Sequence, residues 1–254
     1  MRTALVAIGV GLGLATLLGC GFVVWALDTY KAEPIAEASA LNDPGVVIGE
    51  RDGFLVIRPS TVPSAIGLLF YPGLRIEPKA YLSKLAALSS NARVNIVIGR
   101  PRLNVAAFSI GQADDMRRQL TGIKQWYVAG HSLGGAVACY YARNHLDDLQ
   151  GVVLLGTYCG SDISASRLRV LTIAAGNDGV MPPETIAQHS GELPAGARIV
   201  RIAGMAHSQF GNYGPQSGDG RPSINDDQAR EAIFEAARAF FHQQPDGALG
   251  ALLR

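Results

Sequence analysis

A serine flanked by two glycines stands where an apolar run meets a run of small residues. The sequence Gly-His-Ser-Leu-Gly occupies residues 130–134. Residues 125–129, with the sequence QWYVA, predict a short buried strand, whereas residues 133–143 predict a helix with small residues packed on a sheet. Because glycines make room for a sharply strained turn, this pattern predicts a nucleophile elbow that exposes the Ser132 hydroxyl. A simple turn that contains serine is the alternative in a chain with 30 glycines.

Composition limits the classes of protein to which the chain can belong. Its 254 residues, 48% of them hydrophobic, are enough for one sizeable α/β domain. A formal net charge of +1 supplies no field that would attract nucleic acid, so no nucleic-acid partner is expected. The three cysteines lack metal-site spacing, and neither a metal nor a cofactor is expected. Cys139 and Cys159 are expected as buried thiols, with a disulfide between them as the alternative.

The amino terminus carries no charged side chain from Ala4 to Leu27. A helix of this length, rising about 1.5 Å per residue, would cross a hydrocarbon core of roughly 30 Å. The apolar run continues through residues 22–27 without the small-x-small break at which a secretory signal peptide is cleaved, which favours an uncleaved transmembrane signal anchor over residues 1–27. A lipoprotein lipidated at Cys20 is the alternative. Since Arg2 precedes the run, we expect a membrane-anchored protein whose catalytic domain lies outside the cytoplasm.

The rest of the chain divides into three segments. Residues 28–45 are polar and interrupted by prolines, as in a linker; residues 46–244 are expected to form one domain, and residues 245–254 a tail. The domain opens with apolar runs at 46–50 and 54–58 that are joined through an Asp-Gly step, a signal for a β-hairpin. Strand-like and helical runs alternate after it. This order predicts an α/β fold with a mainly parallel sheet, helices on both faces and an antiparallel N-terminal hairpin.

A serine hydroxyl needs a base to take its proton and an acid to orient that base. Folds with this type of elbow place the acid and then the histidine after later strands. Asp178 follows an apolar strand that ends in Gly-Asn-Asp-Gly, and His207 follows the next strand-like run. We therefore expect Ser132, Asp178 and His207 to form a catalytic triad. Asp162, after the preceding strand, is the rival acid.

The same chemistry needs hydrogen-bond donors for the oxyanion of a tetrahedral intermediate. The amide of Leu133 is the first candidate, because it follows the nucleophile at the start of a helix. The second donor is expected in the loop after the strand at residues 66–71. Gly73 or Leu74 supplies it, and the choice between them stays open.

Several segments resemble those of a known family. They are FYPGLRIEPKAY, PRLNVAAF, WYVAGHSLGGAVA, GVVLLGTY, GNDGV and GMAHSQFGNYGPQSGDG. Together they resemble the bacterial α/β-hydrolase family often called alpha/beta hydrolase fold-5, which overlaps the dienelactone-hydrolase-like group. The resemblance implies the α/β-hydrolase fold and a triad on Ser132, Asp178 and His207. Dienelactone hydrolases commonly use a cysteine nucleophile, so their particular activity is not expected of this chain.

The spacing of the predicted strands bears on the substrate. Residues 157–168 leave no room for a cap domain, and the site is therefore expected to be open. These features favour a serine hydrolase that cleaves a small-molecule carboxylic ester or thioester through an acyl-serine intermediate. A catalytically inactive binding module of the same fold, or a hydrolase acting on amides, is the alternative, because the pocket rather than the fold selects the substrate.

Overall fold

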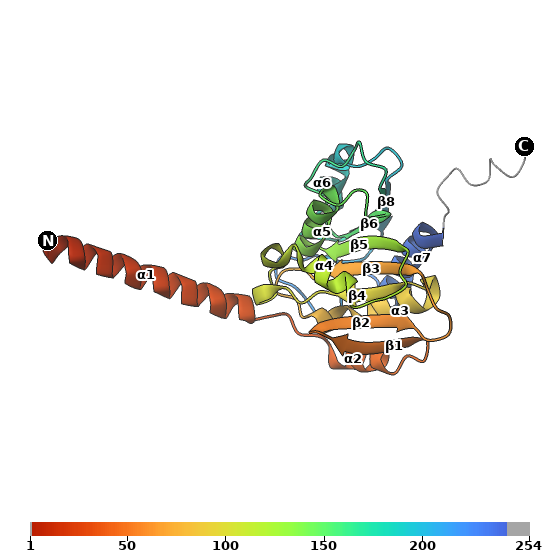
Figure 1. The fold of residues 1–254 in the computed structure, drawn as a ribbon, viewed down its shortest axis with the longest axis horizontal. Helices are drawn as coiled ribbons and strands as arrows, with labels where there is room; N and C mark the ends of the chain where they lie inside the picture. The colour runs from red at the N-terminus through yellow and green to blue at the C-terminus, as the bar shows by residue number, and fades with distance from the viewer. Residues whose placement is uncertain (1, 243–254) are drawn as a thin grey trace, which may run out of the picture.

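A mixed β-sheet of eight strands organises the part of the chain that the structure describes (Figure 1). The structure is a computed structural model that describes residues 2–242, with side chains described for residues 15–241. The strands are β1 (Val46–Arg51), β2 (Phe54–Pro59), β3 (Ile66–Tyr71), β4 (Asn95–Ile98), β5 (Gln125–His131), β6 (Gly151–Leu155), β7 (Arg169–Ala175) and β8 (Arg198–Ile202). The α-helices are α1 (Arg2–Leu27), α2 (Pro34–Leu41), α3 (Leu82–Ala92), α4 (Gln112–Arg117), α5 (Leu133–Arg143), α6 (Pro183–Gln188) and α7 (Asp226–His242). Short 3₁₀ helices are η1 (Pro78–Tyr81), η2 (Arg102–Asn104), η3 (Ala106–Ser109), η4 (Ser190–Glu192) and η5 (His207–Phe210).

The strand order is β1-β2-β4-β3-β5-β6-β7-β8, and only the first two pairings are antiparallel. Strands β1 and β2 form a hairpin in which Arg51 pairs with Phe54. Its two turn residues, Asp52 and Gly53, both have positive φ, of 47° and 81°. A two-residue turn of this kind matches the right-handed twist of the paired strands. The predicted antiparallel hairpin on a mainly parallel sheet is confirmed.

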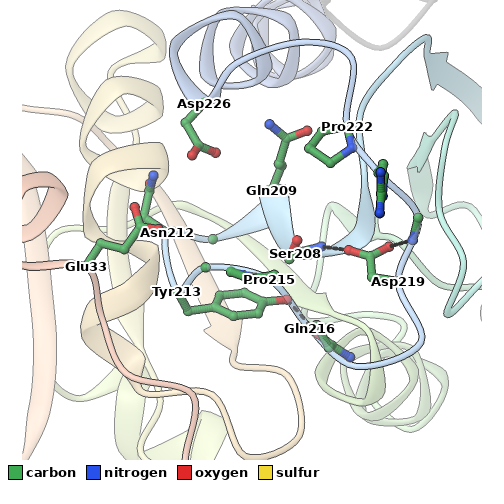
Figure 2. Close-up of a pocket in the computed structure, with 14 residues that line it drawn as sticks. Glu33, Ser208, Gln209, Asn212, Tyr213, Pro215, Gln216, Asp219, Pro222 and Asp226 are labelled. Carbon is green, nitrogen blue, oxygen red and sulfur yellow. Dashed lines mark hydrogen bonds between the residues drawn. The ribbon is translucent and has the colours of Figure 1, made fainter.

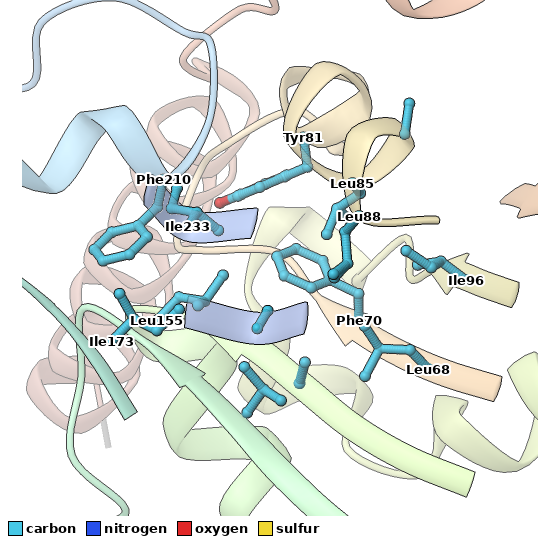
Figure 3. Packing of buried hydrophobic residues seen from close by; sticks show 14 of the residues in the cluster. Leu68, Phe70, Tyr81, Leu85, Leu88, Ile96, Leu155, Ile173, Phe210 and Ile233 are labelled. Atoms are coloured by element: carbon cyan, nitrogen blue, oxygen red, sulfur yellow. The ribbon is translucent and has the colours of Figure 1, made fainter. Parts of the chain in front are cut away.

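Both faces of the sheet are covered by helices, as predicted. Along β3, Leu68 and Phe70 pack into a core that includes buried residues of α3 and α7 (Figure 3). Leu69 and Tyr71 point to the other face and pack against residues of α4 and α5. Because successive side chains of a strand alternate between faces, a strand buried on both sides is apolar throughout. Because the strands in the series β4-β3-β5-β6-β7-β8 run parallel, their carboxyl ends share one edge of the sheet.

The N-terminal region departs most from the expectations. Helix α1 forms over the predicted anchor and extends away from the domain (Figure 1). However, within the part of the chain that the structure describes, no helix combines the length and the apolar character needed to cross a membrane. This finding contradicts the transmembrane signal anchor predicted over residues 1–27.

The segment predicted as a linker, residues 28–45, contains α2 and packs against the domain. Tyr30 N–H donates to the carbonyl of Arg75 over 2.7 Å, and Glu77 N–H donates to the carbonyl of Tyr30 over 3.0 Å. Arg75 also forms an ion pair with Asp28, at 2.8 Å. The loop after β3 thus has the N-terminal segment as its neighbour. The tail predicted over residues 245–254 lies outside the described residues.

Candidate active site

Ser132 lies in a tight turn between β5 and α5. Its backbone has φ 52° and ψ −126°, a strained conformation for a residue with a side chain. A Cβ at Gly130 would lie 2.3 Å from the carbonyl carbon of Gly134, and one at Gly134 would lie 2.2 Å from the carbonyl oxygen of Tyr71. Both flanking glycines are therefore required by close backbone packing. The turn leaves Ser132 partly exposed at the carboxyl edge of the sheet.

Asp178 and His207 meet behind this turn. Asp178 follows β7, His207 begins η5 after β8, and Asp178 Oδ2 lies 2.7 Å from His207 Nδ1. Both side chains are completely buried. The other carboxylate oxygen, Oδ1, accepts the N–H groups of Val180 and Met181, at 2.9 and 2.6 Å. This network makes Asp178 an acceptor on every side, so the His207 ring donates from Nδ1.

The opposite ring nitrogen of His207 is consequently the basic one. Among the described residues, Nε2 of His207 is buried and has no hydrogen-bond partner. An imidazole that donates from Nδ1 has a lone pair on Nε2 with which to accept a proton. The rival acid, Asp162, is exposed and accepts hydrogen bonds from the backbone and side chain of Ser164, at 3.0 and 2.7 Å. The carboxylate that contacts the histidine is that of Asp178.

The candidate oxyanion donors differ in their availability. Leu133 is the first residue of α5, so its N–H has no acceptor within the helix and lies at the positive end of the helix dipole. Gly73 N–H donates to the Tyr81 hydroxyl over 2.9 Å and is therefore already engaged. Within the described part of the chain, Leu74 N–H makes no hydrogen bond. Of the three candidate donors, Leu133 and Leu74 therefore have free amides and Gly73 does not.

His131, inside the elbow, is completely buried beside the catalytic candidates. Its ring centroid lies 4.5 Å from that of His207, and its Nδ1 lies 2.9 Å from the Tyr81 hydroxyl. Burial, followed by the nearby charge of His207, holds the pKa of His131 well below its ordinary range. His131 is therefore neutral near pH 7. The position of His131 next to Ser132 in the sequence excludes it as the base. The sequence gives no sign that its ring contacts Tyr81 and His207. Tyr81 belongs to no motif that would indicate its hydrogen bonds.

The two buried cysteines form a disulfide. Cys139, on α5, pairs with Cys159, in the loop after β6, and their Cα atoms are 5.3 Å apart. This separation is typical of a disulfide. The expectation of two free thiols is corrected, because the elbow helix and this loop pack closely enough to join them. The bond ties the helix that follows Ser132 to the loop beside it.

Residues 67–231 match the sequence profile of the alpha/beta hydrolase family. The match covers more than half of the chain, and the protein belongs to this family. The predicted α/β-hydrolase fold is thereby confirmed, whereas a grouping with the dienelactone hydrolases stays a prediction. No curated protein sequence matches the chain significantly.

Solved structures with the same fold include several esterases. Est1E from Butyrivibrio proteoclasticus is 14% identical with a TM-score of 0.52, covering 83% of this chain and 100% of its own. The carboxylesterase EstE1, cloned from a metagenomic library, is 17% identical with a TM-score of 0.51, covering 82% of this chain and 93% of its own. An esterase from Pyrobaculum calidifontis is 13% identical with a TM-score of 0.54, covering 89% and 92%. At these identities the likeness establishes the fold, and the chain is a hydrolase by family.

Proposed function

We propose that the protein is a serine hydrolase that cleaves small carboxylic esters or thioesters. The observation that carries the proposal is the 2.7 Å contact between the buried side chains of Asp178 and His207, which leaves His207 Nε2 unpaired. Ser132, in the strained elbow, is the nucleophile for which this base is suited. The esterases among the structural neighbours are in keeping with an ester substrate.

The proposed reaction has two stages. Ser132 Oγ attacks the carbonyl carbon while its proton passes to His207 Nε2, and the amides of Leu133 and Leu74 donate to the resulting oxyanion. The proton on Nε2 then passes to the leaving alcohol or thiol, which departs as an acyl-serine forms. A water molecule then attacks the acyl-serine through the same proton transfers, which releases the carboxylic acid and restores Ser132. Asp178 stays ionised and stabilises the transient imidazolium.

The expectation of an open site favours small substrates. The stretch between β6 and β7, residues 156–168, contains no helix and is joined to α5 by the Cys139–Cys159 disulfide. Without a cap over this edge, long acyl chains would have little apolar surface to occupy. We therefore expect short-chain esters to be hydrolysed faster than long-chain ones.

A fluorophosphonate probe tests the nucleophile, since it forms a covalent bond only with an activated serine. The wild-type protein and a Ser164→Ala control, which alters an exposed loop serine, should both be labelled. Ser132→Ala should lose labelling and the hydrolysis of a p-nitrophenyl ester series graded by acyl length. Labelling that persists undiminished in Ser132→Ala, or an unlabelled wild-type protein, would contradict the proposal.

A further inference from the structure

One carboxylate close to the site has no part in the reaction proposed above. Asp219 lies in the segment between η5 and α7, inside the sequence Gly218-Asp219-Gly220. It lines a pocket of about 330 Å³ together with Ser208 and Gln209, the two residues that follow His207 (Figure 2). The side chain is half-buried and points toward backbone amides rather than toward another charge.

Asp219 accepts hydrogen bonds from four backbone N–H groups. Its Oδ1 accepts from His207, Gly179 and Gly220, at 3.0, 3.3 and 2.7 Å. Its Oδ2 accepts from Ser208 at 2.8 Å (Figure 2). An ionised acceptor forms stronger hydrogen bonds than a neutral one, and these four lie on three different segments of the chain. The carboxylate therefore fixes the spacing between those segments.

Two of these donors adjoin the residues that form the buried acid–base pair. Gly179 directly follows Asp178, and the His207 amide belongs to the base itself. Asp219 thus connects the backbones of Asp178 and His207 on one side, while their side chains meet on the other at 2.7 Å. The distance between two backbones sets the distance between their side chains.

Close backbone packing supports the same connection. A Cβ at Gly179 would lie 2.5 Å from the carbonyl oxygen of Gly218, and one at Gly220 would lie 1.8 Å from that of Asn177. The Asn177 side chain also donates from Nδ2 to the carbonyl of Arg221, at 3.0 Å. The loop that carries Asp219 is therefore pressed directly onto the loop that carries Asp178, and glycines allow the approach.

The charge of Asp219 suits this arrangement. Burial opposes ionisation of the carboxyl, but hydrogen bonds from Ser208 and from the backbone of His207 outweigh it and hold the pKa of Asp219 below its ordinary value. The side chain is consequently an acceptor at neutral pH.

We propose that Asp219 is a positioning residue, which holds the turns that carry Asp178 and His207 at the separation that proton transfer from Ser132 requires. The inference rests on the proposed serine hydrolase function. It assigns Asp219 no contact with the substrate, and its effect passes through the Asp178–His207 hydrogen bond. A carboxylate that only anchored the loop would contribute to stability without setting the rate of the reaction.

The variants Asp219→Asn and Asp219→Glu separate the two roles. Asparagine keeps the size but replaces one acceptor oxygen with a donor that faces backbone N–H groups, whereas glutamate keeps the charge and moves it by one methylene group. Asp162→Asn is the matched control, because Asp162 also accepts a backbone N–H in an exposed loop, at 3.0 Å from Ser164 N. Initial rates on a p-nitrophenyl ester are divided by the concentration of folded sites, counted by exhaustive fluorophosphonate labelling.

We expect kcat to fall about 10- to 100-fold in both Asp219 variants, with KM changed less than about 2-fold, since a small displacement of a catalytic group is enough for such a loss. The rate of fluorophosphonate labelling should fall by the same factor. The low-field proton resonance of His207 Nδ1, which reports its hydrogen bond to Asp178, should weaken or broaden. Asp162→Asn should match the wild type in all three measurements.

A folded Asp219→Asn with wild-type kcat and an unchanged low-field resonance would overturn the inference. If Asp219→Asn does not fold, Asp219→Glu decides, and a wild-type kcat in that variant has the same meaning. The proposed function is tested independently of this inference. Retained activity in Ser132→Ala would contradict the function, whatever the result for the Asp219 variants.

Discussion

Replacement of Asp178 by asparagine removes the charge of the candidate catalytic acid and leaves the shape of the side chain almost unchanged. The carboxylate accepts three N–H groups, from His207 Nδ1 on one oxygen and from Val180 and Met181 on the other. An asparagine must present its NH₂ group to one of these two sides. The structure determines which side that is.

The two orientations differ in free energy. An NH₂ group facing Val180 and Met181 would leave two backbone donors of partly buried hydrogen bonds unpaired, at up to about 1–3 kcal/mol each. An NH₂ group facing His207 keeps that hydrogen bond with its direction reversed, because the ring can shift its proton from Nδ1 to Nε2 and accept at Nδ1 instead. The second orientation is favoured. In it, His207 Nε2 carries a proton and cannot accept one from Ser132.

The expected loss of activity is therefore large, whereas the loss of stability is small. The wrong tautomer in a serine triad lowers kcat about 10⁴-fold, equivalent to about 5 kcal/mol of transition-state stabilisation. Since both backbone hydrogen bonds survive, the free energy of unfolding should fall by no more than about 2 kcal/mol. Ester hydrolysis, fluorophosphonate labelling and urea denaturation measure these quantities on one preparation.

Asp162→Asn is the control, because Asp162 is the other acid that the chain order allows. It should retain the activity of the wild type. An Asp178→Asn variant within about 10-fold of the wild type would refute the orientation argument, which calls for a loss near 10⁴-fold. A large loss in Asp162→Asn would instead reassign the acid.

Three further predictions concern the supports around the elbow. Reduction of the Cys139–Cys159 disulfide, which spans a sequence separation of 20, should lower the free energy of unfolding in urea by about 3 kcal/mol; identical curves with and without reductant would exclude the bond. Tyr81→Phe leaves Gly73 N–H without its acceptor and should lower the free energy of unfolding by about 1–3 kcal/mol, so an unchanged thermal midpoint would argue against that contact. His131 stays neutral in the folded state, but in the unfolded state it binds a proton below its ordinary pKa of 6.5. The free energy of unfolding should therefore fall as the pH decreases below 6.5, by at most about 1.4 kcal/mol per pH unit. This slope should be reduced in His131→Phe, and an equal slope in that variant would contradict the assignment.

Local patterns were sufficient to predict the fold. The hairpin at Asp52 and Gly53, the alternation of strands and helices, and the elbow at Ser132 each depend on a few neighbouring residues, whose period and turn chemistry leave few alternatives. Chain order also indicated which loops would carry the acid and the base. The structure brings Asp178 and His207 together, while their catalytic roles stay predictions.

Features that depend on distant residues were not predictable in this way. From the sequence, Asp219 is indistinguishable from an ordinary turn residue. Only the structure shows that it accepts hydrogen bonds from the loops that carry Asp178 and His207. Tyr81 reads as a core aromatic, although its hydroxyl accepts Gly73 N–H. The N-terminal interpretation was wrong, since the absence of charge along a run does not by itself establish a helix that is long and apolar enough to cross a membrane.

The geometry of the site thus depends on residues outside the reacting set. The disulfide joins the helix that follows Ser132 to the loop after β6. The Tyr81 hydroxyl accepts a hydrogen bond from Gly73 N–H. Asp219 accepts hydrogen bonds from the loops that carry Asp178 and His207. Each of these contacts restrains one turn at the carboxyl edge of the sheet, where the backbone has no strand neighbours to hold it. Substitutions at the supports should therefore reduce kcat more than they change KM whenever they alter the spacing of reacting groups, and reduce only stability when they do not. That distinction makes kinetic and unfolding measurements on the same variant more informative than either alone.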